Sequence, residues 1–312
     1  MIEVAIMIEG QNGLTWERWK RIAVLADQMG FAGLYRSDHY TNANPPDKES
    51  LEAWVSLAWL ASHTQNIEFG PLVSPLSFRD PTMLARMAAS VDDLSGGRLI
   101  LGLGAGWQER EHRNYGWDLL EIPERFQRFE EGLEIITRLL KNDEPSTFMG
   151  DYYHLEDGIL LPRPQRKGGP SILIGGNGPK RTLPLAARFA DEWNGLYTSA
   201  QEIAGRNALL DELAEKEGRD PRSIRRSMMI GCEFGRDEAE VHALVNKRTG
   251  GQRTPDELWE TFGMAVGTAN QVVEQLGHLA EAGVQRVMLQ WLDLDDMERL
   301  EALANSVLPQ LS

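Results

Sequence analysis

Short apolar runs alternate with helical segments along almost the whole chain, and this alternation restricts the possible folds more than any other feature. Eight runs stand out, at residues 2–8, 31–36, 67–73, 98–103, 171–174, 191–196, 227–234 and 284–291. Each is rich in β-branched and other apolar residues and leads into a segment of helical period. Parallel strands need crossovers of about a dozen residues, and eight βα units can close on themselves. We therefore predict a (β/α)8 TIM barrel, with an open doubly wound sheet as the alternative.

The helical segments carry recognisable ends. Thr15 precedes an apolar stripe of helical spacing that Gly30 ends, and Asp80-Pro81 opens a later helix. No linker, low-complexity stretch or internal repeat marks a boundary. We expect residues 1–312 to form a single domain.

The connection between the fourth and fifth runs, at about residues 104–170, is too long for a simple βα unit. Residues 125–141 have apolar positions at helical spacing, whereas residues 147–161 alternate like a hairpin with Gly150-Asp151 at its turn. We predict an insertion here, between strands 4 and 5, over one end of the barrel.

The net charge of the chain limits the classes of partner that it can bind. Lys and Arg number 32 and Asp and Glu 47, so the formal net charge is 32 − 47 = −15. Such a chain repels nucleic acid and anionic membranes, which we exclude as partners. No apolar run approaches the ~20 residues of a membrane span, and the N-terminus lacks a signal-peptide pattern. Cys232, the only cysteine, allows no intrachain disulfide and no zinc site. These features favour a cytoplasmic protein.

Candidate functional residues follow the strands, because the C-terminal ends of the strands form the working face of this fold. His39, after Asp38 at the end of the second run, could act as an acid, a base or a hydrogen-bond donor. A metal site built from Asp38, His39, Glu109 and His112 is the weaker hypothesis, since the last two lie in a highly charged segment. We predict no metal.

A glycine-rich turn, Gly175-Gly176-Asn177-Gly178, leads from the fifth run into a helix expected to begin near Pro179. Backbone N–H groups and a helix N-terminus together can bind an anion. Residues 158–190 contain no Asp or Glu but six basic residues, which also favours an anionic ligand. A tight turn on a solvated basic edge is the alternative.

A second glycine-rich segment, Gly102-Leu103-Gly104-Ala105-Gly106, lies on the fourth run. No helix follows at once, so it is not a dinucleotide fingerprint. Its glycines either let a flat ring approach the backbone or allow close packing between strands.

Taken together, these segments resemble the bacterial luciferase-like monooxygenase superfamily, and most closely its F420-dependent oxidoreductases. The resemblance covers nearly the whole chain. It is carried by residues 30–39, 79–86, 94–98, 102–107, 150–153, 175–178, 186–194 and 267–268.

The resemblance implies a flavin, or the deazaflavin coenzyme F420, across the barrel mouth, with its ring against the third strand and its phosphate at the glycine turn. It implies a non-prolyl cis peptide near Leu72, Val73 and Ser74, and His39 beside the reactive carbon as the catalytic residue. Sugar-phosphate dehydrogenases of the superfamily carry a Glu where this chain has Trp107, which favours a more apolar substrate. The implied cofactor-binding residues are Asp38, Val73, Ser74, Gly104, Gly106, Trp107, Gly175, Gly176, Asn177 and Gly178.

The implied chemistry is hydride transfer between F420 and a small organic substrate, and the family suggests a homodimer. The basic stretch favours F420 over FMN, because the deazaflavin tail carries a phosphate and several carboxylates. An FMN-dependent monooxygenase and a non-catalytic flavin-binding paralogue are the alternatives within the family. A sugar-phosphate isomerase or aldolase barrel is the alternative outside it, with Glu9 and Glu233 as its only acids at strand ends.

Overall fold

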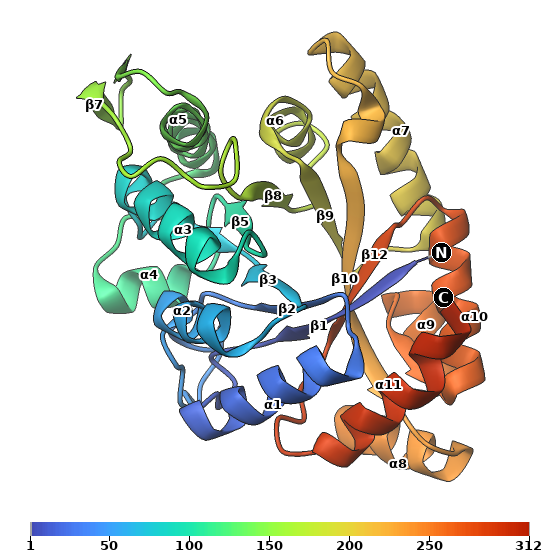
Figure 1. Cartoon of the computed structure of the whole chain (residues 1–312). Coiled ribbons are helices and arrows are strands. Elements are labelled where there is room, and N and C mark those ends of the chain that lie inside the picture. The colour runs from blue at the N-terminus through green and yellow to red at the C-terminus, as the bar shows by residue number, and fades with distance from the viewer. Residues whose placement is uncertain (1, 312) are drawn as a thin grey trace.

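A computed structural model describes residues 2–311 and confirms the predicted barrel, with a strand at each of the eight runs (Figure 1). All neighbouring barrel strands are parallel. The third run forms β3, and the residues directly after it form the short strand β4; these two strands lie at opposite ends of the hydrogen-bonded sheet order, β3-β2-β1-β12-β10-β9-β8-β5-β4. Because β3 and β4 belong to one chain segment, the sheet closes on itself. The barrel strands are β1 (Glu3–Ile8), β2 (Gly33–Arg36), β3 (Glu68–Pro71), β4 (Ser74–Pro75), β5 (Ile100–Gly104), β8 (Ser171–Gly175), β9 (Glu192–Leu196), β10 (Arg225–Phe234) and β12 (Arg286–Gln290).

Helices surround the strands, and their ends follow the predicted signals (Figure 1). The Thr15 side chain caps α1 and Gly30 ends that helix at φ 79°, while Asp80 accepts hydrogen bonds from the N–H groups of Thr82 and Met83. The short strand β11 (Ala265–Gly267) pairs with the far end of β10. The helices outside the long connection are α1 (Trp16–Met29), α2 (Ala53–His63), α3 (Pro81–Ser95), α6 (Thr182–Phe189), α7 (Ala200–Lys216), α8 (Glu238–Thr249), α9 (Pro255–Phe262), α10 (Ala269–Glu281) and α11 (Met297–Leu311), with a 3-10 turn at Pro221–Ser223.

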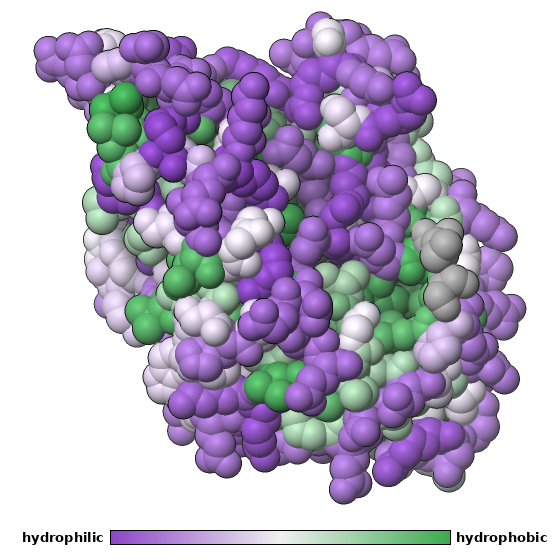
Figure 2. Space-filling model, in the orientation of Figure 1, coloured by the Kyte–Doolittle hydropathy of each residue, from purple (hydrophilic) through white to green (hydrophobic). Residues whose placement is uncertain are grey.

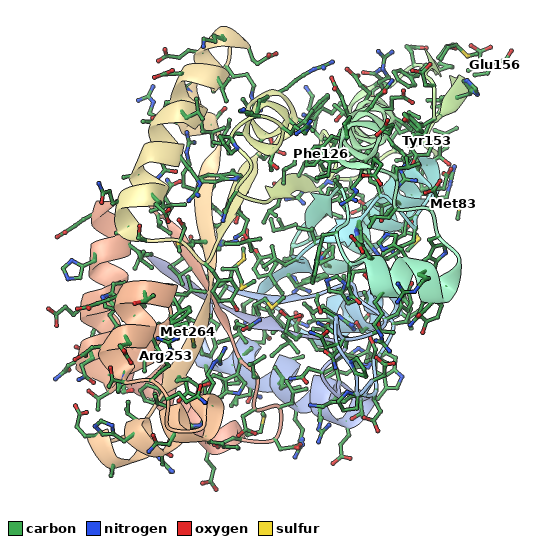
Figure 3. All side chains as sticks on the ribbon, turned by 180° about the vertical axis from the view of Figure 1, so that it is seen from behind. Met83, Phe126, Tyr153, Glu156, Arg253 and Met264 are labelled. Atoms are coloured by element: carbon green, nitrogen blue, oxygen red, sulfur yellow. The ribbon has the colours of Figure 1, made fainter. Side chains whose placement is uncertain are left out.

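The long connection holds α4 (Glu109–Tyr115), α5 (Ile122–Lys141) and a hairpin of β6 (Ser146–Met149) and β7 (His154–Gly158). Only part of it lies over the mouth. The helix α5 packs between α3 and α6 in the outer layer. The hairpin lies outside that layer, where Glu131 of α5 accepts hydrogen bonds from the N–H groups of its turn. Figure 3 shows Glu156 at the outer edge of the molecule and Tyr153 nearer the helices.

Glycines close the barrel. A Cβ on Gly70 would lie 1.9 Å from the Ile100 carbonyl oxygen, and one on Gly102 would lie 2.0 Å from the Pro71 oxygen. A Cβ on Gly104 would lie 2.6 Å from a Val73 methyl group. Of the two interpretations left open for Gly102 and Gly104, close packing of the strands is what the structure shows.

The opposite, N-terminal end of the barrel is closed by ion pairs. Arg286 donates to Glu3 at 2.7 Å, to Glu68 at 2.6 Å and to the Tyr35 hydroxyl at 2.6 Å. Burial raises the pKa of Glu192, which lies 3.7 Å from the same guanidinium. This end therefore serves stability, and the open end is the place for a ligand.

The surface fits the composition of the chain. The face in Figure 2 is mostly hydrophilic, as expected where 25% of residues are charged. Among the helices of residues 2–311, none has the length and apolar character needed to cross a bilayer. Cys232 is buried, and burial raises the pKa of its thiol to about 12, so this group is unreactive.

The closure by glycines can be tested with Gly102→Ala. The added methyl group meets backbone, which cannot rotate away, so we expect the free energy of unfolding to fall by about 1–3 kcal/mol. Gly205→Ala in α7 is the control, since nothing lies within 4 Å of its added Cβ, and it should be neutral or stabilising by up to about 1 kcal/mol. Urea unfolding followed by circular dichroism measures both. Equal stability of the Gly102→Ala variant and the wild type would contradict tight closure.

Candidate active site

His39 lies at the barrel mouth, paired with a carboxylate that the sequence did not single out. Its Nδ1 is 2.7 Å from Glu111 Oε1, and the other Glu111 oxygen accepts from the Tyr40 N–H at 3.0 Å. Glu111 is buried, whereas His39 keeps 15% of its side chain exposed. Within residues 2–311, His39 Nε2 makes no hydrogen bond. One ring nitrogen is thus anchored and the other is free for a ligand.

Burial alone would lower the pKa of His39, but Glu111 outweighs it, with smaller contributions from Glu9 and Asp38. The net effect raises the pKa of His39 above its usual value. The ring therefore stays protonated to a higher pH than a free histidine, and the Nε2–H of the protonated ring can donate to an oxygen atom of a ligand.

The residues of the metal hypothesis do not come together. His112 turns to the Gln108 carbonyl and the Ser77 hydroxyl, each at 2.7 Å, while Glu109 is exposed. Over residues 2–311, no cluster of three or more His, Cys, Asp or Glu has a metal-binding arrangement. The helix α4 is only two turns long, so the sequence did not show that Glu111 faces His39.

Asp38 and Ser74 form a buried support behind the mouth. The Asp38 carboxylate accepts from Arg79 at 2.6 and 2.9 Å and from the Ser74 hydroxyl at 2.6 Å. Trp54 in turn donates to Ser74 at 3.0 Å. Both predicted cofactor-binding side chains are thus occupied with each other, and they hold β4 in place beside β2.

Val73 follows the cis peptide bond between Leu72 and Val73, which lies where the family resemblance implied it. Its side chain packs beside Gly104 and Gly175 and against the barrel-interior cluster. Val73 thus lies where a side chain on Gly104 would stand, and it offers an apolar floor to the mouth.

Trp107 is an exposed aromatic residue beside His39. The residue is 61% exposed, and its ring meets the His39 ring edge-on, with centroids 5.6 Å apart. It also lines a hollow of about 590 Å³ whose other walls include Arg113 and the loop at Pro45. Gly106, before it, has φ 85°, and a Cβ there would lie 2.5 Å from the Ser77 hydroxyl. Gly106 thus shapes the turn that projects Trp107 outward.

The glycine turn differs from the prediction in one respect, because α6 begins at Thr182 and not near Pro179. The N–H groups of Thr182 and Leu183 both donate to the Gly178 carbonyl, and Pro184 has no N–H. The helix end itself therefore offers little to an anion. Four backbone N–H groups of the turn make no hydrogen bond within residues 2–311, namely those of Asn177, Gly178, Lys180 and Arg181.

The other polar groups of the turn are engaged. Asn177 exchanges two hydrogen bonds with the backbone of Leu196, at 2.6 and 2.9 Å. The Gly176 N–H donates to the Asn194 carbonyl, and its own carbonyl accepts from Trp193. The Asn177 side chain and the Gly176 backbone thus fix the turn to β9.

The basic stretch is less basic than its sequence indicated. Arg166 pairs with Asp92 at 2.7 Å and Arg163 with Asp143 at 3.0 Å, while Arg188 pairs with Glu130 and Glu134. These partners lie far away in the sequence, so the acid-free stretch hid them. Lys180 and Arg181 are exposed at the turn and have no ion pair within the described residues.

The residues present fit a phosphorylated planar cofactor. The turn offers four N–H groups without hydrogen bonds and two cations without ion pairs to a phosphate, and Val73 offers an apolar surface. His39 offers a free nitrogen at the same mouth. The phosphate and the ring of such a cofactor can therefore bind at the same mouth as the free nitrogen of His39.

Comparison with known proteins agrees with this arrangement. The sequence profile of the luciferase-like monooxygenase family matches residues 2–253. The chain is 27% identical to the F420-dependent glucose-6-phosphate dehydrogenase of Kineococcus radiotolerans over 286 residues, covering 90% of this chain and 80% of the relative. It is 24% identical to the FMNH(2)-dependent dimethylsulfone monooxygenase of Pseudomonas fluorescens over 327 residues, covering 93% and 85%. An F420-dependent secondary alcohol dehydrogenase shares the fold over 100% of this chain and 99% of its own, with a TM-score of 0.86 at 19% identity.

The His39–Glu111 pair should make a pH-dependent contribution to the free energy of unfolding, which Glu111→Gln should remove. Because the pKa of His39 is raised in the folded protein, this contribution is complete below the unfolded pKa of about 6.5. It is lost as the pH rises through the folded pKa. We expect Glu111→Gln to lower the His39 pKa and to reduce the free energy of unfolding more at pH 6 than at pH 9. NMR titration of the ring and urea unfolding at both pH values measure this. An unchanged His39 pKa would contradict the pairing.

Proposed function

The chain belongs to the luciferase-like monooxygenase family and is an oxidoreductase, and on this premise we propose that it transfers hydride between coenzyme F420 and a small organic substrate. The observation that carries the proposal is the placement of a paired histidine and an unpaired cationic turn at one barrel mouth. When bound, the deazaflavin supplies the carbon that accepts or donates the hydride.

The turn would hold the cofactor phosphate. The N–H groups of Gly178, Lys180 and Arg181 can donate to its oxygens, and the Lys180 and Arg181 side chains add charge. Val73 would support the ring from below through apolar contact. These groups position the cofactor and perform no chemistry themselves.

His39 would move the proton that accompanies the hydride. With Nδ1 held by Glu111, the Nε2–H of the imidazolium donates to a carbonyl oxygen when the substrate is reduced. The neutral ring accepts the hydroxyl proton when the substrate is oxidised. Glu111 keeps the ring orientation fixed in both directions, so it is a positioning residue.

F420 is preferred over FMN in this proposal because its tail is the more anionic. Lys180 and Arg181 are exposed and unpaired, so they can meet carboxylates beyond the phosphate. Monooxygenation with reduced FMN is the second candidate, supported by the similarity to FMNH(2)-dependent relatives.

The cofactor preference is tested by the double variant Lys180→Gln/Arg181→Gln. Loss of two partly exposed charge contacts should weaken F420 binding about tenfold, and added salt should weaken the wild type more than the variant. Lys167→Gln is the control, because Lys167 is also exposed but precedes β8 at the opposite barrel end. Fluorescence titration with F420 and with FMN measures the affinities. Tighter FMN binding by the wild type would favour the monooxygenase.

The role of His39 is tested by His39→Gln. Loss of a positioned proton donor should slow hydride transfer by about 100-fold or more, with F420 affinity nearly unchanged. Single-turnover reduction of F420 by small secondary alcohols, followed in a stopped-flow instrument, measures the rate. His63→Gln, an exposed histidine on α2, is the control. A rate for His39→Gln within about threefold of the wild type would remove the catalytic role.

A further inference from the structure

Within the part of the chain that the structure describes, Glu9 lacks a cationic partner, unlike three other carboxylates at the mouth. Asp38 is paired with Arg79, Glu111 with His39, and Glu233 with Arg248. Glu9, the first residue after β1, makes no ion pair within residues 2–311. It is half-buried, so its charge is only partly solvated.

Side-chain amides hold Glu9 in one orientation. Gln290 donates to its Oε1 at 2.7 Å, and Gln11 donates to its Oε2 at 2.8 Å. Both amides are fixed in turn, since Tyr197 donates to Gln290 at 2.6 Å and Ser37 donates to Gln11 at 2.6 Å. A carboxylate has roughly four acceptor positions, so about two remain open on Glu9.

Glu9 faces the interior of the mouth on the same side as His39. Ala5 and Met7, the alternate residues before it on β1, belong to the barrel-interior cluster, so Glu9 continues their row. The strands β1 and β2 are neighbours, and the Ser37 N–H donates to the Ile8 carbonyl at 3.0 Å. The charge of Glu9 contributes to the raised pKa of His39, which agrees with this placement.

We propose that Glu9 binds the substrate by accepting a hydrogen bond from a hydroxyl or ammonium group carried close to the reacting carbon. The substrate class is then a hydroxy- or amino-substituted alcohol, or the corresponding carbonyl compound. This inference rests on the proposed function. His39 meets the reacting oxygen, and Glu9 meets the second polar group.

The hydrogen-bond partners of Glu9 indicate that it binds a ligand rather than stabilises the fold. Carboxylates that stabilise this fold are satisfied by a protein cation, as Asp38 is by Arg79, or by three backbone N–H groups, as Glu131 is. Glu9 has two amide donors and no cation among the described residues, so its charge is uncompensated and acceptor positions stay open. A donor from the substrate would complete its shell, and an ammonium group would also neutralise it.

The test uses three probes with equal numbers of heavy atoms: 1-amino-2-propanol, 1,2-propanediol and 2-butanol. Only the first two carry a second donor. Binding is read from the His39 ring signal of ¹³C-histidine-labelled protein, which has six histidines and is assigned with His39→Gln. We expect the two donor probes to bind the wild type about tenfold more tightly than 2-butanol, and Glu9→Gln to reduce this preference to within about twofold.

Glu109→Gln is the matched control, because it removes an exposed carboxylate at the same mouth that has no amide anchors. It should keep the preference. The inference would be overturned by equal binding of the three probes to the wild type, or by a His39 signal that shifts with none of them. It would also be overturned if Glu109→Gln lost the preference for the donor probes as Glu9→Gln does. A parallel loss of F420 affinity in Glu9→Gln would also overturn it, since Glu9 would then contact the cofactor. A preference seen in binding without any F420 turnover would refute the proposed function and leave this inference standing.

Discussion

The packing of Val73 against the glycines of β5 and β8 is the contact on which the mouth depends. Val73 lies in the segment between β3 and β4, the two strands at the ends of the sheet order, so this contact lies where the barrel closes. Inside the barrel the side chain forms an apolar floor. Behind it, the next residue, Ser74, is tied to Asp38 and through it to Arg79. The segment is thus fixed on both sides, and the strand end that carries His39 is fixed with it.

The fold was predictable because its determinants are local. Apolar runs of strand length alternate with segments of helical period, and caps such as Thr15 and Asp80 mark where helices begin. Each of these patterns involves residues close in the sequence. The family resemblance added the position of the cis bond after Leu72. The single domain over residues 1–312 and the homodimer stay predictions.

The site was less predictable because its determinants are distant. His39 meets Glu111, 72 positions away, and the short helix α4 gave no periodicity to distinguish Glu111 from Glu109. The basic stretch misled for the same reason. Its acid-free composition indicated a strongly positive surface, but Arg166 is paired with Asp92, 74 positions earlier. Charge counts along a chain predict a surface field only where no long-range ion pair intervenes.

Two carboxylates near one imidazole can serve different purposes because their environments differ. Glu111 is buried and bonded to the ring at Nδ1, so it fixes the ring orientation and favours the imidazolium. Glu9 is half-buried and held by amides, so its charge also favours the protonated ring, but Glu9 makes no hydrogen bond to that ring. The free Nε2 thus belongs to a ring that Glu111 holds in place, at a mouth where Glu9 adds a second negative charge. As pH rises through the raised pKa of His39, the same nitrogen changes from donor to acceptor, which suits reduction below that pKa and oxidation above it.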